Sequence, residues 1–552
     1  MPMTFWFDRD DLLAALSKRV KGFHAGYRQN VALLGPEAVG KTTLLKRLLQ
    51  QESTGSPSLI AFYVEVRDGE SFAEWASRFV ETLLYEAQEV TRNIPETAAC
   101  AKRLLLALAQ EERDDELYEI LWDLPQRLTQ ETGVPCLLLL DEFHRLGRFS
   151  VKGPFQKLGR AIMVQSATMY MLASSQPSVA RKILREGLNL LFGQFETVEV
   201  GPLDPAASLR AIQSVWSEDR GDPFLAYLLV ELAQGYPAYL DPLVHGLVNR
   251  PDQERALLDL LEELLLEPNG ILRQRFEGRL RLIPIHRSRR TCIQVLAAAA
   301  DGFHRVEQIG EALDRSPSQI LRALHLLEQV GLVAKQGVFY RIPDRLFQLW
   351  MLTAYPILQG VALTDPTHIR VRFRDAAWSW VLKVREAIHL PLEDQVKELV
   401  CQWGGELVEI EGRRILLPKS GRVELLPVVA GRTLLVAHPA GESGKSWLLI
   451  PWAGSLEEAQ ARQIIQEISA LPLKNYRKVL LGAHPVEINA RLVLQEARVR
   501  LWDLRVLNNL LDLYGLTRIP LPAGLQAPLA PTIQILSEQL PLLTSTKIER
   551  AK

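Results

Sequence analysis

With 552 residues the chain is too long for one hydrophobic core, and at about 150 residues per domain we expect roughly three or four domains. The 64 basic and 65 acidic residues leave a net charge of −1, which excludes a strong overall field toward nucleic acid or an anionic membrane, so any basic surface must be local. No apolar run approaches the ~18 residues of a membrane span and the start is acidic where a signal peptide is basic, so we expect a soluble, cytoplasmic protein without a membrane partner.

The four cysteines lie far apart in the sequence, without a CxxC pair or a nearby histidine cluster. This spacing argues against a zinc site and against a disulfide framework, and predicts idle or buried thiols in a reducing compartment. The cysteines are Cys100, Cys136, Cys292 and Cys401.

The first nucleotide-binding signal is the segment GPEAVGKTT, which matches the phosphate-loop pattern G-x-x-x-x-G-K-[ST] at every fixed position. An apolar run at 31–34 precedes it and a helical pattern follows Lys41, so the motif has the strand, loop and helix that it requires. The two glycines let backbone amides surround phosphate oxygens, while Lys41 would reach the β- and γ-phosphates and Thr42 would ligate Mg²⁺. The predicted nucleotide-binding residues of this loop are Gly35, Pro36, Glu37, Ala38, Val39, Gly40, Lys41, Thr42 and Thr43.

The second signal follows the apolar run 136–140, where Asp141 and Glu142 end a predicted buried parallel strand. We expect Asp141 to hold the water shell of Mg²⁺ and Glu142 to polarise the attacking water, with Lys41 as the other catalytic residue. The two segments together predict a P-loop NTPase that binds and hydrolyses a nucleotide. Because the phosphate loop does not read the base, the residues alone do not choose ATP over GTP.

Further strands alternate with helical segments, so the predicted fold class is α/β with a parallel sheet, and a long helical insert covers 72–132. Ser174 and Ser175 end one of these strands, where a polar side chain would lie beside the γ-phosphate and report its presence. The alternative is that a serine caps the helix that starts at Pro177. The further predicted strands are 59–66, 168–175 and 195–203.

The order of these motifs resembles the archaeal-type P-loop ATPases that lie near the STAND and AAA+ branches, over about the first 350 residues. The resemblance implies ATP as the nucleotide, Phe7 and Arg9 packed beside it, and Gly235 and Pro237 in a helical lid. The segments that carry the resemblance are FDRDDLLAAL (7–16), the phosphate loop, LLLLDEFHRL (137–146), LASS (172–175) and GYPAYL (235–240).

One departure from the family pattern concerns an arginine that would act across a subunit contact. These ATPases commonly carry a Gly-Arg pair before the fifth strand, where this chain has Gly193 and Gln194. Arg181 and Arg185 on the preceding predicted helix are the remaining candidates, and the alternative is that both are solvated helix charges. A homo-oligomer therefore stays an open prediction.

Helical periodicity continues from 204 to about 270, as expected of a lid after a P-loop core. A helix, a second helix opening at Val306, a turn, a third helix at 317–329 and a hairpin at 333–342 then predict a winged helix-turn-helix. Within the third helix, the residues predicted to face the core are Ile320, Leu321, Leu324 and Leu327.

The opposite face of this third helix predicts a contact with double-stranded DNA. Gln319 and Arg322 would read bases in a major groove, and Lys335 on the wing would lie near phosphate. The alternative is that the winged helix packs on neighbouring domains as a switch element. Further residues expected to be exposed or to add basic charge nearby are Ser318, His325, Gln329, and the arginines at 279, 281, 287, 289 and 290.

In the last third of the chain, the predicted helix LEDQVKELVCQWGG is followed by four strands, the helix SLEEAQARQIIQEISAL and two more strands. This order resembles the restriction-endonuclease-like fold. That fold needs an acid at the end of its second strand and an acid-x-lysine pair on its third, because these groups hold Mg²⁺ and position water. Aligned by pattern, the chain offers Glu424 at the first place but His438, Pro439 and Ala440 at the second, which implies a nuclease-like domain that does not cut. The alternative is a rearranged metal site of Glu424 with His438. The strands predicted here are 406–410, 414–418, 422–429, 432–438, 478–483 and 499–504.

The predicted function is an ATP-binding and ATP-hydrolysing regulator whose nucleotide state controls DNA binding. The alternative is a STAND-like signalling or assembly scaffold that binds protein or RNA and uses slow hydrolysis as a reset. The predicted domains are a P-loop ATPase core (1–203), a helical lid (204–275), a winged helix-turn-helix (276–351), a connecting region (352–375), an inactive restriction-endonuclease-like domain (376–518) and a proline-rich tail (519–552).

Overall fold

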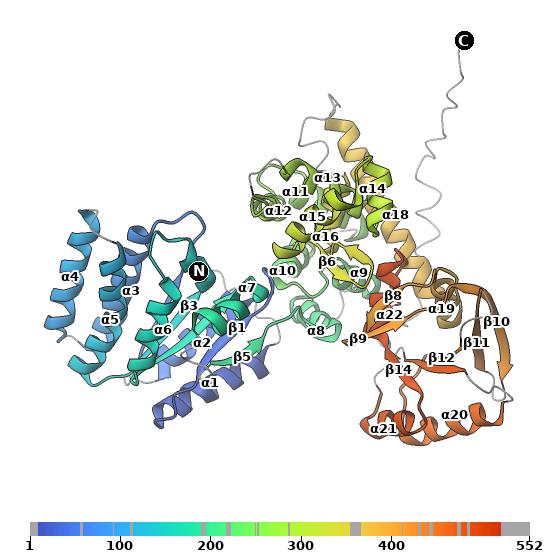
Figure 1. Ribbon diagram of the computed structural model, residues 1–552, viewed down its shortest axis with the longest axis horizontal. Coiled ribbons are helices and arrows are strands. Elements are labelled where there is room, and N and C mark those ends of the chain that lie inside the picture. Colours follow the sequence, from blue (N-terminus) through green and yellow to red (C-terminus); the bar gives the residue numbers. More distant parts are fainter. Residues whose placement is uncertain are drawn as a thin grey trace, which may run out of the picture.

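The computed structural model describes residues 9–519 apart from 56–58, 92, 111–113, 189–194, 217–221, 249, 251–252, 285–287, 354–365, 411, 429–431, 441–444, 472–475 and 483–485. Three bodies follow one another: an α/β body, a helical body and a second α/β body (Figure 1). Among these residues, no helix is both long and apolar enough to span a bilayer. Phe7, Gly193, Gln194 and nearly all of the predicted tail lie outside the described residues.

The first body is built on a parallel sheet of five strands in the order β2-β3-β4-β1-β5. β1, β3 and β4 are buried along their whole length, as expected of parallel strands covered by helices on both faces. The sheet confirms the predicted α/β fold class and is consistent with a P-loop NTPase. The fifth strand ends at Glu199, four residues earlier than the predicted end at 203. The strands are β1 (Asn30–Leu34), β2 (Ile60–Glu65), β3 (Cys136–Asp141), β4 (Thr168–Ser174) and β5 (Phe195–Glu199).

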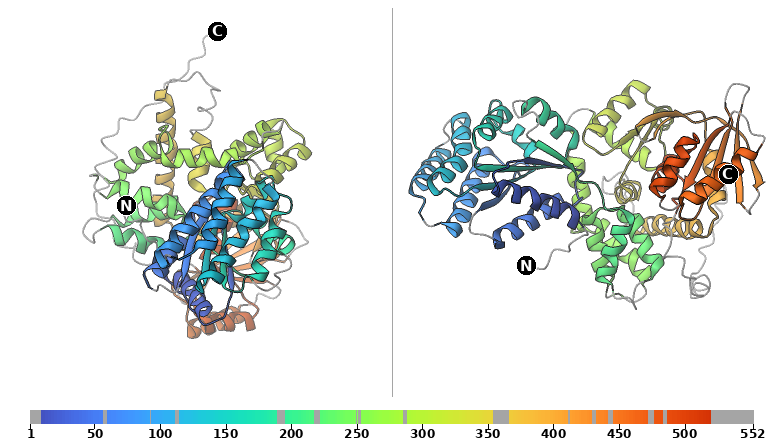
Figure 2. Two further views of the ribbon diagram at one scale, coloured as in Figure 1. Left: turned by 90° about the vertical axis from the view of Figure 1, so that its left-hand side faces the viewer. Right: turned by 90° about the horizontal axis from the view of Figure 1, so that it is seen from below.

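The predicted insert at 72–132 consists of three helices at the end of the molecule farthest from the middle body (Figure 2). A capping box of Ser71 and Glu74 starts the first of them, and Trp75 packs against Trp122 with ring centroids 5.9 Å apart. These helices cover one face of the sheet and α1 with α2 covers the other. The helices are α1 (Asp10–His24), α2 (Lys41–Gly55), α3 (Phe72–Val90), α4 (Pro95–Ala109), α5 (Asp114–Thr132), η1 (Phe143–Arg148), α6 (Pro154–Val164), α7 (Pro177–Lys182) and η2 (Ile183–Gly187).

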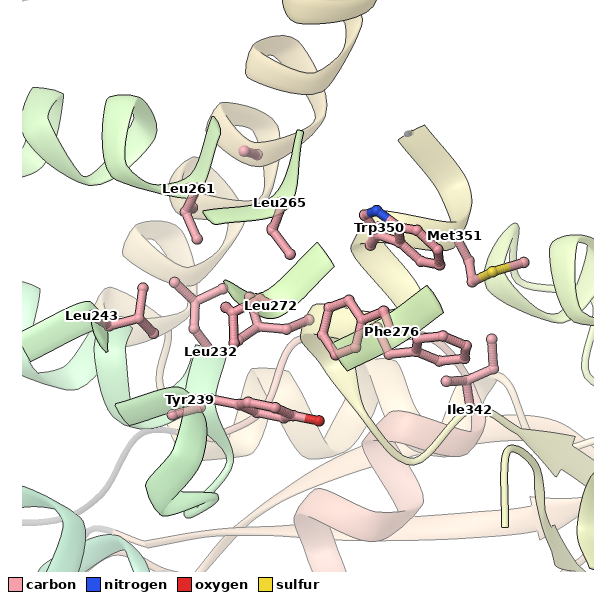
Figure 3. Packing of buried hydrophobic residues seen from close by; sticks show 14 of the residues in the cluster. Leu232, Tyr239, Leu243, Leu261, Leu265, Leu272, Phe276, Ile342, Trp350 and Met351 are labelled. Carbon is pink, nitrogen blue, oxygen red and sulfur yellow. The ribbon is translucent and has the colours of Figure 1, made fainter. Parts of the chain in front are cut away.

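The middle body has one continuous hydrophobic core, part of which is drawn in Figure 3. Phe276 lies at its centre, with ring centroids 5.7 Å from Tyr239 and 5.7 Å from Trp350. The predicted boundary between lid and winged helix, at 275/276, thus falls within a helix whose side chains join the two. The elements are α8 (Pro205–Val215), α9 (Pro223–Ala233), α10 (Pro237–Leu247), α11 (Gln253–Leu265), α12 (Ile271–Arg281), α13 (Arg289–Ala300), α14 (Val306–Leu313), α15 (Pro317–Gln329), β6 (Ala334–Gln336), β7 (Phe339–Arg341), α16 (Arg345–Thr353) and α18 (Pro366–His389).

Two details of this body differ from the sequence predictions. Leu321, expected to face the core, is exposed, because the buried face of α15 consists of Ile320, Ala323, Leu324 and Leu327. The predicted connecting region 352–375 contains the start of α18, which packs on the core of the middle body.

The second α/β body has a mixed sheet of five strands in the order β10-β11-β12-β13-β14. β10, β11 and β12 pair antiparallel, whereas β12, β13 and β14 pair parallel. β8 and β9 form a separate antiparallel pair. The elements are α19 (Leu392–Cys401), β8 (Leu407–Ile410), β9 (Arg413–Leu416), β10 (Ser420–Val428), β11 (Arg432–Pro439), β12 (Trp447–Trp452), α20 (Glu458–Ala470), β13 (Arg477–Gly482), α21 (Ile488–Glu496), β14 (Arg500–Asp503) and α22 (Leu504–Leu513).

The central strand β12 was not predicted, and its presence corrects the alignment to the nuclease-like pattern. Glu424 lies on β10, the first strand of the sheet, so the second and third strands are β11 and β12. Neither strand contains an aspartate, a glutamate or a lysine. The carboxylates and lysine that the nuclease pattern needs are therefore missing from both strands.

Candidate nucleotide site

The phosphate loop connects β1 to α2 and has the unusual backbone that its sequence predicts. Ala38 and Gly40 have left-handed φ angles of 70° and 90°. A β-carbon on Gly35 would collide with the carbonyl oxygen of Val200, so only glycine fits at this close approach. For Ala38, a left-handed conformation costs on the order of 1–2 kcal/mol, which the surrounding contacts must offset.

Lys41 is the buried cation of this loop. Its side chain is 5% exposed, and its Nζ donates to the carbonyl oxygens of Gly35 at 2.9 Å and Pro36 at 2.8 Å. Burial lowers the pKa of Lys41, and the nearby carboxylates of Glu142 and Asp141 oppose this change. A buried ammonium whose hydrogen-bond partners are loop carbonyls fits an anionic ligand such as a phosphate.

Asp141 ends β3 and collects hydroxyl donors at its carboxylate. Its Oδ2 accepts hydrogen bonds from Thr42 at 2.6 Å and from the Tyr63 hydroxyl at 3.0 Å. Burial and the Asp141 carboxylate raise the pKa of Tyr63, so this phenol stays protonated and donates. A threonine hydroxyl beside a carboxylate is the oxygen donor set that suits Mg²⁺. Sequence analysis missed Tyr63, although it stands in a predicted strand that pairs with β3.

Glu142 follows in a left-handed conformation, with φ of 54°. Its Oε2 accepts hydrogen bonds from the Ser175 amide at 3.1 Å and from the Ser175 hydroxyl at 2.7 Å. The carboxylate is thus held by the end of β4, on the same edge of the sheet as Asp141. Ser175, predicted beside the γ-phosphate, contacts the predicted base directly.

His144 completes this cluster, and sequence analysis did not single it out. Its Nδ1 lies 3.0 Å from the Ser174 hydroxyl and 3.3 Å from Glu142 Oε2. Burial first, and then the charges of Arg145, Arg148 and Lys41, lower the pKa of His144 to about 3. The ring is therefore neutral at neutral pH, and its contact with Glu142 is not an ion pair. The helix-capping alternative for the serines is weak, since α7 has Gln176 at its N-cap and no side-chain cap.

The residues implied by the family resemblance lie around the same loop. Arg9 donates through Nη2 to the carbonyl oxygens of Val39 at 3.1 Å and Gly201 at 2.5 Å. Gly235 has a φ of 76°, and a β-carbon there would collide with the carbonyl oxygen of Leu203. The next residues approach the phosphate loop, since the Ala238 amide donates to the Ala38 oxygen at 3.4 Å. The start of α10 therefore rests on the loop.

The two candidate arginines for a subunit contact lie on the surface. Arg181 pairs with Glu199 at 2.7 Å and Arg185 with Glu186 at 3.4 Å, and all four side chains are more than half exposed. They contact carboxylates of their own chain, as the solvated-charge interpretation expects.

A cavity of about 340 Å³ opens beside the phosphate loop and reaches the middle body. On its wall, Arg275 Nη1 lies 3.6 Å from Glu37 Oε1, and Arg279 Nη1 pairs with Asp344 Oδ2 at 2.5 Å. Sequence analysis listed Arg279 only as added basic charge and did not consider Arg275. The lining includes Pro36, Glu37 and Ser175 of the first body, Tyr236 just before α10, Arg275 and Arg279 of α12, Gln329 at the end of α15, and Gly331 after it.

The predicted DNA-contacting residues remain on the surface. Gln319 and Arg322 are exposed on α15, and Lys335 is exposed on β6 with its Nζ 5.4 Å from the Tyr340 ring centroid. The turn of the β6–β7 hairpin is packed, however, because a β-carbon on Gly337 would collide with the carbonyl oxygen of Leu407 on β8. The β6–β7 hairpin thus contacts the second α/β body, as the interdomain-packing alternative expects.

The remaining candidates for metal chemistry do not converge. Glu424 Oε2 lies 3.9 Å from His438 Nε2, and Glu424 also pairs with Arg422 at 2.9 Å. Within the described ranges, no three His, Cys, Asp or Glu side chains are grouped as metal ligands would be. Cys100, Cys136, Cys292 and Cys401 are free thiols, and only the last is exposed.

Residues 6–160 match the family model described as the AAA ATPase domain. No curated protein sequence matches the chain. Among solved structures, the chain is similar to a Walker-type ATPase of Pyrococcus abyssi, with 19% identity over 64% of this chain and 98% of that chain and a TM-score of 0.48. It is also similar to the ORC2 protein of Aeropyrum pernix in its ADPNP–ADP complexes, with 12% identity over 67% of this chain and 95% of that chain and a TM-score of 0.42. The ORC1 protein of the same organism in complex with DNA is similar with 16% identity over 66% of this chain and 97% of that chain and a TM-score of 0.39. At these identities and scores the likenesses assign no activity and no partner. The family match itself supports an ATP-binding AAA ATPase domain over residues 6–160.

Proposed function

We propose that this chain is an ATP-binding, ATP-hydrolysing regulator whose nucleotide state controls the binding of duplex DNA. In this proposal the first body binds and hydrolyses ATP. The helices α13–α15 with the β6–β7 hairpin act as a winged helix, and the second α/β body is a nuclease-like domain that does not cut.

The chemistry of the first body rests on four side chains at one edge of its sheet. Lys41 supplies a buried positive charge to the phosphates, and Glu142 orients and polarises the attacking water. Thr42 and Asp141 are the residues that would hold Mg²⁺, which supplies neutralisation of the phosphate charge when bound. Ser175 keeps Glu142 at the end of β4 through two hydrogen bonds, so the base is positioned by a neighbouring strand.

The observation that carries the proposal is the cavity shared by the phosphate loop and the end of α15. Glu37 of the loop faces Arg275 of α12 across it, and Arg279 one turn further along α12 is held by Asp344. A rearrangement of the loop around a nucleotide would therefore act directly on α12 and on the residues that follow α15. Since α15 carries the exposed Gln319 and Arg322, nucleotide state and DNA contact would be coupled through packed side chains.

The experiment that tests the proposal is ATP turnover by the full chain with and without duplex DNA, with Glu142→Gln as the blank. We expect turnover that depends on Glu142 and a change in its rate when DNA is added. Turnover that is indifferent to DNA, together with no salt-sensitive duplex binding, would overturn the proposal. That result would favour the scaffold alternative, with protein or RNA as the partner.

A further inference from the structure

In the parallel half of the second sheet, basic side chains lie at the amino ends of the strands. Arg477 starts β13 opposite Trp447 of β12, and Arg500 starts β14 opposite Val479 of β13. Side chains alternate along a strand, so Arg477 and Arg500 lie on the same face of the sheet, two residues apart in register. Lys445 precedes β12 and lines the same groove as Arg477. Neighbouring strands are about 4.8 Å apart, so this edge concentrates positive charge within a short distance.

Two grooves extend this charge over the surface. One, of about 480 Å³, is lined by Lys419, Lys445 and Arg477, and none of its described lining residues is acidic. The other, of about 520 Å³, is lined by the guanidinium groups of Arg413, Arg491, Arg498 and Arg500. Arg477 of the first groove and Arg500 of the second start neighbouring strands on the same face of the sheet, so the two grooves lie close together. We call the seven basic side chains that line these two grooves the basic strip.

Among the described residues, few carboxylates line the basic strip. Among the described residues that line the two grooves, the one acidic residue is Asp503, and its carboxylate accepts a hydrogen bond from the Val506 amide at the start of α22. Within the part of the chain that the structure describes, no residue of the strip forms an ion pair with a carboxylate. Three partly buried arginines of the other two bodies, by contrast, pair with glutamates: Arg19, Arg345 and Arg385 contact Glu196, Glu231 and Glu254. Cations at this spacing repel one another unless anions lie between them.

Arg498 is a second and independent observation. It follows the end of α21 with a left-handed φ of 56°, a position that glycine usually takes after a helix. The side chain is exposed and lines the groove, so packing does not require an arginine there. The strained conformation is consistent with a role for the guanidinium group itself.

We propose that the basic strip binds the phosphate backbone of a nucleic-acid duplex. Successive phosphates offer a row of anions, and each neutralised phosphate releases counterions. Binding of single strands usually needs aromatic faces for base stacking, but the tryptophans that line the grooves, Trp447 and Trp502, are only 3% and 2% exposed. Phosphate chemistry is common to DNA and RNA duplexes. The inference rests on the proposed function only for the existence of a nucleic-acid partner, because the strip lies on a different body from α15.

The test is fluorescence anisotropy of labelled duplex DNA, duplex RNA and single-stranded DNA with the full chain over a range of salt concentrations. In the Arg477→Gln/Arg500→Gln variant we expect duplex affinity to fall about tenfold or more and the salt dependence, log K against log [salt], to flatten by about 2 units of slope. Arg498→Gly removes one cation and relieves the left-handed strain, so we expect a flattening of about 1 unit without loss of folding.

Matched variants separate this inference from the proposed function. Arg462→Gln on α20 removes an exposed arginine of the same body that is paired with Glu458, and we expect unchanged binding. The inference is supported if the chain binds a duplex more tightly than a single strand and loses this binding in the strip variants. Whether the preferred duplex is DNA or RNA then identifies the source of the phosphates. Unchanged affinity and slope in the strip variants, or tighter binding to single strands, would overturn it. Loss of duplex binding in Arg322→Ala but not in the strip variants would also overturn the inference, and the proposed function would stand. Unaltered binding in all of these variants would overturn both the inference and the proposed function.

Discussion

The two five-stranded sheets of this protein place their charged residues at opposite ends of their parallel strands. In the first sheet the carboxyl ends of β3 and β4 carry Asp141, Glu142 and Ser175, next to the phosphate loop after β1. In the second sheet the carboxyl end of β14 carries Asp503, which caps α22. Arg477 and Arg500 lie at the amino ends of β13 and β14.

This difference separates a site built for chemistry from a surface built for contact. Parallel strands usually present ligands at their carboxyl ends, where loops and helix N-termini converge. The first sheet follows that rule and gathers a buried lysine, a hydroxyl and two carboxylates. The second sheet has no acid or lysine on β11 and β12, and its charge is on grooved surface. We therefore expect substitutions in the first sheet to change rates, and substitutions in the second to change affinities for a polyanion.

The largest expected effect comes from Glu142→Gln. Loss of the base should lower ATP turnover by about 10²–10⁴-fold while ATP still binds, because Lys41 and the loop are unchanged. Steady-state phosphate release and equilibrium binding of labelled ATP measure the two quantities. Asp503→Asn, which changes the carboxylate at the equivalent end of the second sheet and keeps a capping oxygen, should leave both unchanged. ATP turnover by Glu142→Gln at the wild-type rate would show that Glu142 is not the base.

Lys41→Ala should produce the next largest effect, on affinity. Hydrogen bonds to a charged group contribute about 1.5–3 kcal/mol, so ATP affinity should fall by about 10–100-fold. The matched control is Lys445→Ala in the second sheet, which should not change ATP affinity. Titration with a fluorescent ATP analogue measures the ATP affinity of both variants. Equal ATP affinities in Lys41→Ala and Lys445→Ala would contradict the contrast between the two sheets.

A third prediction concerns how the second α/β body is joined to the middle body. Gly337→Ala forces a β-carbon against the Leu407 carbonyl, whereas Gly412→Ala, with a similar left-handed φ of 73°, has no atom within 4 Å. Both variants carry the backbone strain of about 1–2 kcal/mol, but only Gly337→Ala adds overpacking of about 1–3 kcal/mol. Hydrogen exchange at β8 should therefore rise more in Gly337→Ala. Equal exchange in the two variants would mean that the β6–β7 hairpin does not pack on β8.

The nucleotide-binding segment could be predicted from sequence because its information is local. The strand, loop and helix around Lys41 follow one another directly, and Asp141 closes an uninterrupted apolar run, so spacing alone places them. Tyr63 and His144 could not be found in this way. Their contacts with Asp141 and Glu142 depend on the register of β2 on β3 and on the left-handed turn at Glu142, which are tertiary features.

Two misses in the later bodies have similar physical causes. β12 reads WLLIPW, an apolar run without alternation that contains Pro451, and such a run gives no strand period. The strand tolerates this proline because its pairing with β11 ends at Leu449, before the missing N–H. The predicted boundary at 275/276 does not separate two cores, because Phe276 packs against residues from both predicted domains. Amino-acid composition does not reveal such a contact.

The smallest effect we predict is a pH dependence of stability through His144 in the first sheet. The pKa of His144 in the folded chain is lowered to about 3, below its ordinary value of about 6.5, so the unfolded chain takes up the proton first as pH falls. The stabilisation is complete above pH 6.5 and is lost as pH falls toward 3. Between pH 7 and pH 5, His144→Gln should lose about 1–2 kcal/mol less unfolding free energy than the wild type. The control is His389→Gln, at an exposed position on α18, which should follow the wild type in denaturant unfolding at both pH values. An unchanged slope in His144→Gln would mean that burial does not lower the pKa of His144, whereas a larger loss of stability in the variant than in the wild type would mean that the ring is charged and pairs with Glu142.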